Sequence, residues 1–138
     1  MLNLPKKKVI FASIATIIIL GVGISISQSI MTQQKYENVF YLDATFHPSQ
    51  KQVEIKFSDN TLQTTSVILE ILGMETSFQR TFNGNSFTLM VPFDGEPQYG
   101  WKVVPITLVV SHPEFGQVGL KTDIHDEGQS GKVIFTQL

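Results

Sequence analysis

The hydrophobic positions of the chain follow two different patterns, of which the first is a nearly continuous apolar run over residues 9–26. Only three hydroxyl residues interrupt this run, and it contains no ionised side chain, which would be costly in lipid. As a helix it rises about 27 Å at ~1.5 Å per residue, close to the ~30 Å hydrocarbon core of a bilayer. The pattern predicts a transmembrane helix over residues 9–27.

Three lysines at positions 6–8 stand directly before the apolar run. Because basic residues favour the cytoplasmic side, we expect residues 1–8 to form a cytoplasmic tail and the rest of the chain to lie outside. The chain is then a single-pass protein of the cytoplasmic membrane that contacts the lipid bilayer through its anchor. A cleaved signal peptide, with Ser25 and Ser27 before the cut, is an alternative, although the run exceeds the usual ~7–15 apolar residues. A buried helix of a soluble protein is a further one.

Small residues fall near one face of the predicted anchor. Ala12, Thr16, Gly23 and Ser27 share this face, and small residues line the positions where transmembrane helices pack closely. This stripe indicates lateral contact with another membrane protein or with a second copy of the chain.

The second pattern begins after a short polar linker over residues 28–35. Apolar and polar residues now alternate, as in Val53, Ile55 and Phe57, and this period of two is typical of half-buried strands. Turn residues divide residues 36–138 into eight predicted strands, near 37–46, 51–58, 64–73, 76–82, 86–93, 102–111, 117–125 and 132–138. Short strands with turns every ~8–12 residues predict an all-β fold, an immunoglobulin-like or fibronectin-like sandwich of about 7–8 strands.

Two local features refine this fold. Asn83-Gly84 fits a two-residue turn, which predicts a hairpin with Phe82 and Phe87 on one face. Pro105 lies inside the predicted strand 102–111 and indicates an edge or a bulge there. We expect large aromatic side chains to anchor the core, namely Trp101, Phe87 and Phe57.

Length and charge exclude several functional classes. The chain has 138 residues, enough for one ordinary domain, and no cysteine, which excludes disulfides and thiolate chemistry. Of its 10 basic residues, three precede the anchor, so residues 28–138 keep seven against 12 acidic ones, a net charge of −5. This charge argues against a nucleic-acid partner. No catalytic sequence motif occurs, and we expect the protein not to be an enzyme.

Asp123 and His125 are the candidate metal ligands. If residues 117–125 form one strand, these two side chains share a face, and a third ligand would complete a copper or zinc site. This Asp-x-His corner resembles the end of periplasmic copper-resistance proteins, which are small β-sandwiches, although the glycine spacing differs and the histidine at their mature N-terminus is missing. His47 and His112 each precede a proline, which favours structural roles in turns.

An anchor followed by a β-sandwich resembles the small anchored β-sandwich proteins of archaeal cell surfaces. The resemblance implies a non-catalytic module for protein binding or assembly, such as an accessory subunit of a membrane complex. The exposed edge of the last strand, 132–138, offers a place for strand addition. One alternative is a copper-handling domain that serves a membrane copper enzyme through Asp123 and His125. Another is a type IV pilin-like subunit, although Lys8-Val9 lacks the small residue that normally precedes a pilin helix.

Overall fold

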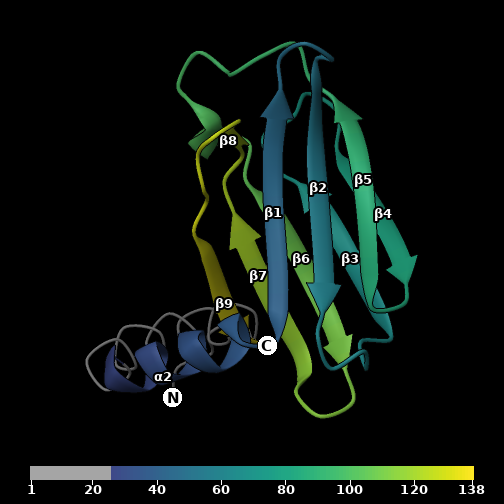
Figure 1. Ribbon diagram of the computed structural model, residues 1–138, viewed down its shortest axis with the longest axis vertical. Coiled ribbons are helices and arrows are strands. Elements are labelled where there is room, and N and C mark those ends of the chain that lie inside the picture. Colours follow the sequence, from purple (N-terminus) through teal and green to yellow (C-terminus); the bar gives the residue numbers. More distant parts are fainter. Residues whose placement is uncertain (1–25) are drawn as a thin grey trace, which may run out of the picture. The chain divides into compact units, whose positions relative to one another are not determined.

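Two β-sheets stack face to face in this protein, whose computed structural model describes residues 26–138 (Figure 1). The unit that begins at Lys35 contains all the strands found in the described residues. The first sheet has the order β5-β2-β1-β8 and the second the order β4-β3-β6-β7-β9. The elements are α2 (Ile26–Glu37), β1 (Phe40–His47), β2 (Gln52–Asp59), β3 (Ser66–Ile71), β4 (Phe78–Asn83), β5 (Ser86–Pro92), the 3-10 helix η1 (Trp101–Val103), β6 (Ile106–His112), β7 (Gly116–Thr122), β8 (His125–Asp126) and β9 (Val133–Gln137).

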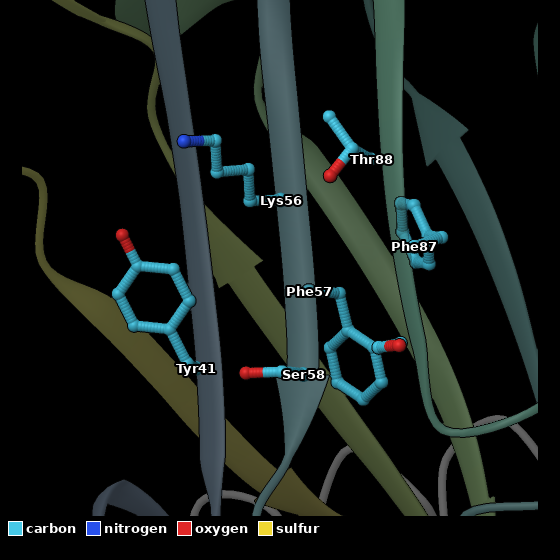
Figure 2. Close-up of a pocket in the computed structure, with 7 residues that line it drawn as sticks. Tyr41, Lys56, Phe57, Ser58, Phe87 and Thr88 are labelled. Atoms are coloured by element: carbon cyan, nitrogen blue, oxygen red, sulfur yellow. The ribbon is translucent and has the colours of Figure 1, made fainter.

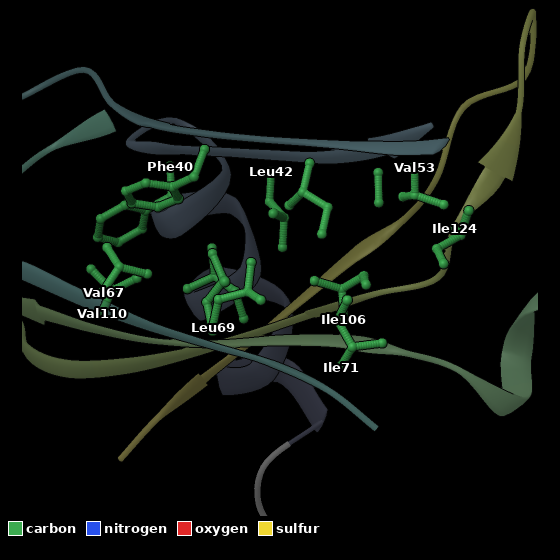
Figure 3. Packing of buried hydrophobic residues seen from close by; sticks show 14 of the residues in the cluster. Phe40, Leu42, Val53, Val67, Leu69, Ile71, Ile106, Val110 and Ile124 are labelled. Atoms are coloured by element: carbon green, nitrogen blue, oxygen red, sulfur yellow. The ribbon is translucent and has the colours of Figure 1, made fainter. Parts of the chain in front are cut away.

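The alternating apolar residues of the strands fill the space between the sheets, as the period of two predicts. Phe40, Leu42 and Val53 of the first sheet face Leu69 and Ile106 of the second (Figure 3). The prediction of an all-β fold is therefore confirmed. Two of the expected aromatic anchors, Trp101 and Phe57, are buried, and the partly buried Phe87 stacks on Phe57.

The hairpin predicted at Asn83-Gly84 does not form. Strand β4 pairs with β3 in the second sheet, and β5 pairs with β2 in the first, so the turn between them crosses from one sheet to the other. The facing rings were nevertheless placed correctly, because Phe82 and Phe87 stack with centroids 4.0 Å apart across the gap. A strand that changes sheets keeps its apolar side toward the core, and the alternation therefore cannot distinguish a hairpin from a crossing.

The predicted strand 102–111 is wrong at its beginning. Strand β6 starts one residue after Pro105 and lies between β3 and β7, a central position that a proline inside the strand would disrupt. The preceding residues form η1 instead. This helix lies against the end of β3, where Gly73 has a φ of +77° and a Cβ atom would come within 2.0 Å of the Val103 carbonyl oxygen. Only glycine fits both constraints.

The predicted strand 117–125 is divided. Strand β7 ends at Thr122 in the second sheet, and β8 begins at His125 in the first. Ile124 lies between them, 2% exposed, and fills the core from the crossing segment. Because the inner faces of both sheets point to the same core, the alternation of apolar residues continues through the crossing.

The anchor predicted over residues 9–27 lies outside the described residues except for its last two, and the cytoplasmic tail 1–8 lies wholly outside. Residues 28–35, expected as a linker, belong to helix α2. Within residues 26–138, no helix combines the length and the apolar character needed to cross a membrane.

A buried carboxylate closes the end of the sandwich where β2 leads to β3. Asp59 accepts hydrogen bonds from the amide and hydroxyl groups of Thr61 and Thr64 at 2.6–2.8 Å and from the amide of Gln63 at 3.1 Å. Burial favours the neutral acid, but the hydrogen bonds outweigh it and lower the pKa of Asp59 from 3.8 to about 2. The ionised side chain therefore holds the connecting loop in place.

We predict that Asp59→Asn lowers the free energy of unfolding by about 2 to 4 kcal/mol, because an amide nitrogen would face buried donors. The depressed pKa contributes stability that is present above pH 3.8 and is lost as the pH falls toward 2. Chemical denaturation across this pH range should therefore show that acid lowers the free energy of unfolding less in the variant than in the natural protein. Asp94→Asn, in an exposed loop, is the matched control, and an equal effect of both variants would contradict the assignment.

Candidate functional site

The edge of the first sheet is only partly covered. Strand β8 runs parallel to β1 and pairs with it at just two positions, Thr45 with His125 and Phe46 with Asp126. Within the described part of the chain, no strand lies beside residues 40–44 of β1 on that side. This leaves an open stretch of sheet edge.

The register shows which backbone groups face outward from this open stretch. The amide of Asn60 donates to the carbonyl of Val39 at 3.0 Å, which extends the antiparallel ladder between β1 and β2. Hydrogen-bonded pairs alternate along such a ladder, so Tyr41 and Asp43 also bond to β2. The N–H and C=O groups of Phe40 and Leu42 therefore point away from β2, toward the open side.

A groove of about 450 Å³ lies beside this open stretch, between β1 and β9. Strand β9 is one of the two edge strands of the second sheet among residues 26–138, at the opposite edge from β4. Four apolar side chains, Phe40, Leu42, Val133 and Phe135, line the groove together with the charged groups of Glu37, Asp43 and Lys132 and with Tyr41, Ser130 and Gly131. Apolar walls beside outward-pointing backbone groups are suited to an extended peptide, which supplies both kinds of partner.

His125 fastens β8 to β1 next to the groove. Its Nε2 atom lies 2.6 Å from Oδ1 of Asp43 and 3.3 Å from the hydroxyl of Thr45, and its Nδ1 atom lies 2.8 Å from the carbonyl oxygen of Asp126. Burial disfavours the charged ring, but the hydrogen bonds to Asp126 and Asp43 outweigh it and raise the pKa of His125. The protonated ring donates at both nitrogens, which this arrangement requires.

His47 forms a second fastening at the end of β1. Its Nδ1 atom lies 2.7 Å from a carboxylate oxygen of Glu127, just after β8, and its Nε2 atom lies 3.2 Å from Glu54 on β2. The hydrogen bonds to Glu127 and Glu54 raise the pKa of His47. We call His47 with Glu127 and His125 with Asp43 the two histidine clasps, since each joins β1 to the segment 125–127.

The predicted metal ligands do not lie on one strand. Asp123 is exposed in the crossing segment, whereas His125 is buried in β8, with both ring nitrogens within hydrogen-bond distance of protein oxygens. The described residues contain no group of three or more histidine, cysteine, aspartate or glutamate side chains arranged to hold a metal ion. The geometry favours His125 as a hydrogen-bond donor to Asp43.

A second hollow, of about 380 Å³, lies on the first sheet over β1, β2 and β5. Figure 2 shows Tyr41, Lys56, Ser58 and Thr88 around it, with their polar atoms on this face. Lys56 pairs with Glu54 at 3.6 Å. Among residues 26–138, no histidine or carboxylate lines the hollow to activate its hydroxyl groups, so these residues form no nucleophilic pair there.

A histidine, a threonine and an aspartate do meet inside the protein. Nε2 of His112 lies 2.9 Å from the hydroxyl of Thr61, which donates to Asp59 at 2.6 Å. Nδ1 of His112 accepts the amides of Glu114 and Phe115, so Nε2 carries the proton and cannot accept one from Thr61. The side chains of His112 and Asp59 are also fully buried. This cluster joins the ends of β2 and β6 and has a structural role, as expected for His112.

Sequence reasoning missed the partners of the two clasps. Asp43, Thr45 and His47 alternate with Leu42 and Ala44 along β1, a pattern that indicates only a solvated outer face. Their partners lie about 80 positions further along the chain. No family model, curated protein or solved structure matches this chain, so its function is argued from geometry alone.

We predict that the free energy of unfolding falls as the pH rises above 6.5. Both clasp histidines have a pKa raised above the ordinary 6.5, so their contribution is present below that pH and is lost as the pH rises through the raised values. His125→Gln and His47→Gln should flatten this dependence in urea titrations. Glu127→Gln should reproduce only the effect of His47→Gln, and a slope that survives in both histidine variants would refute the clasps.

We also predict an alternation of amide hydrogen exchange along β1. The amides of Phe40 and Leu42 should exchange rapidly in the isolated protein, whereas those of Tyr41 and Asp43 should be protected by β2. Two-dimensional NMR in deuterated buffer measures each amide separately. Equal protection of all four amides would show that another part of the chain covers the open edge.

Proposed function

We propose that this protein is a non-catalytic binding module, anchored in the cytoplasmic membrane, whose exported β-sandwich holds an extended segment of a partner protein. The segment would lie in the groove between β1 and β9 and continue the line of β8. The observation that carries this proposal is the open edge of β1, where the backbone groups of Phe40 and Leu42 face an apolar groove.

The composition of the open edge supports strand addition. Exposed edges in monomeric proteins are commonly blocked by lysine, proline or a bulge, and residues 40–44 contain none of these. Their one charged residue, Asp43, is paired with His125. An added strand would gain backbone hydrogen bonds at Phe40 and Leu42, and the apolar groove would select its side chains.

The strand order supports an immunoglobulin-like sandwich. In such domains strands A, B and E lie side by side in one sheet and C, F and G in the other. Strands β1, β2 and β5 have the sequence positions and the order of A, B and E, and β3, β6 and β7 those of C, F and G. The fourth strand lies beside β3, and β8 and β9 are additions that flank the groove.

The proposed location of the sandwich, outside the cytoplasmic membrane, is supported by the amino-terminal sequence. The apolar run at 9–26 follows three lysines, which favours an anchor with the sandwich outside the cytoplasm. An anchor confines the module to the membrane surface, which suits an accessory subunit of a membrane complex. Its partner segment would then belong to a protein of the same membrane.

A single-thiol variant tests both the location and the groove, because the natural chain has no cysteine. In Tyr41→Cys the only thiol stands between the groove and the second hollow, at a residue that is 53% exposed. A membrane-impermeant maleimide that carries a photoreactive group is applied to intact cells. We expect labelling from outside and, after illumination, one defined crosslinked protein.

Gln79→Cys, exposed on β4, is the matched control and should be labelled without yielding that crosslink. Labelling that requires cell lysis would refute the location. Labelling of both variants with the same crosslinked products would refute the groove as the binding site.

A further inference from the structure

A pocket of about 330 Å³ shares Lys132 with the groove and is lined by three lysines in all. Lys102 follows Trp101 in η1, Lys121 lies on β7, and Lys132 directly precedes β9. Thr122, Asp123 and Ile134 complete the lining. Three distant parts of the chain thus supply one positive charge each to a single pocket.

This concentration of positive charge is unusual for an acidic domain. Residues 28–138 contain seven basic residues against 12 acidic ones, yet three of the seven line this pocket and only one carboxylate, Asp123, accompanies them. Among the described residues, the only lysine in an ion pair with a carboxylate is Lys56. The three ammonium groups of the pocket are therefore available to an external anion.

We propose that this pocket binds a phosphate group, either as a free ion or as the phosphate monoester of a larger molecule. Three ammonium groups and one carboxylate sum to +2, which complements the charge of about −1.5 to −2 on a phosphate monoester at neutral pH. Lysine acts as a point charge with three donors and suits the several oxygens of a compact anion.

The remaining lining residues fit the same ligand. The hydroxyl of Thr122 donates to the carbonyl oxygen of Lys132 at 3.0 Å, so recognition falls to the lysines. At ~30 Å³ per water molecule, the pocket has room for a phosphate and an attached organic group. The side chain of Ile134, 50% exposed, offers an apolar contact to such a group.

The test is a titration of the full-length chain with inorganic phosphate and, separately, with glycerol 3-phosphate, at a constant ionic strength of about 0.1 M. Isothermal calorimetry gives the affinity, and NMR shifts of the amides of residues 121, 122 and 132 locate the ligand. We expect saturable binding that weakens about fivefold to tenfold in Lys121→Gln and in Lys132→Gln. Lys51→Gln, at the exposed turn between β1 and β2, is the matched control and should bind as the natural chain does.

Each outcome decides the proposal. Tighter binding of glycerol 3-phosphate would assign the site to a phosphate monoester such as a lipid headgroup, and equal binding would assign it to the phosphate ion alone. Absence of saturable binding to both ligands would overturn the proposal. An equal loss in Lys51→Gln would also overturn it, because it would show only general charge attraction. Circular dichroism of every variant confirms that a lost signal does not reflect unfolding.

Discussion

The short parallel ladder between β1 and β8 is the constraint on which the candidate site depends. Two paired positions are too few to hold a strand by backbone hydrogen bonds alone, and the segment 125–127 must be fixed by other contacts. The two histidine clasps and the buried side chain of Ile124 supply them. Because β8 runs parallel to β1 and begins only at His125, opposite Thr45, residues 40–44 of β1 remain open and the groove lies beside them.

The two histidine clasps make the position of the β8 segment depend on the protonation of their imidazole rings. Each clasp pairs an imidazole with a carboxylate across β1 and the segment that follows the crossing, and each pairing favours the protonated ring. The buried Asp59 network at the other end of the sandwich behaves in the opposite sense, since its hydrogen bonds favour the ionised carboxylate. The Asp59 network thus stabilises the loop after β2 above pH 4, and the clasps stabilise the β8 segment below the raised histidine pKa values. Both contributions are present together in the mildly acidic range.

The sequence predicts the layers of this fold better than it predicts the connections. Alternation places Val53, Ile55 and Phe57 in the core correctly, because burial depends only on which face a residue occupies. It fails at Asn83-Gly84 and at Ile124, where the chain changes sheets while its apolar side still faces the same core. The same limit applies to the candidate site. The sequence indicates His125 as a candidate residue, but its partner Asp43 lies 82 positions away, and this pairing can be predicted only when the crossing is known.

An open apolar edge is a hazard that most proteins remove, which makes its retention here informative. The pair formed by Asp43 and His125 neutralises the one charge that would otherwise discourage an added strand, and β8 covers β1 just far enough to anchor the crossing. Because β8 runs parallel to β1, a longer β8 that covered residues 40–44 would need the residues before His125, and these form β7 and the crossing segment with the buried Ile124. The open edge is therefore a consequence of the crossing from β7, and it is the surface on which the proposed strand addition would take place.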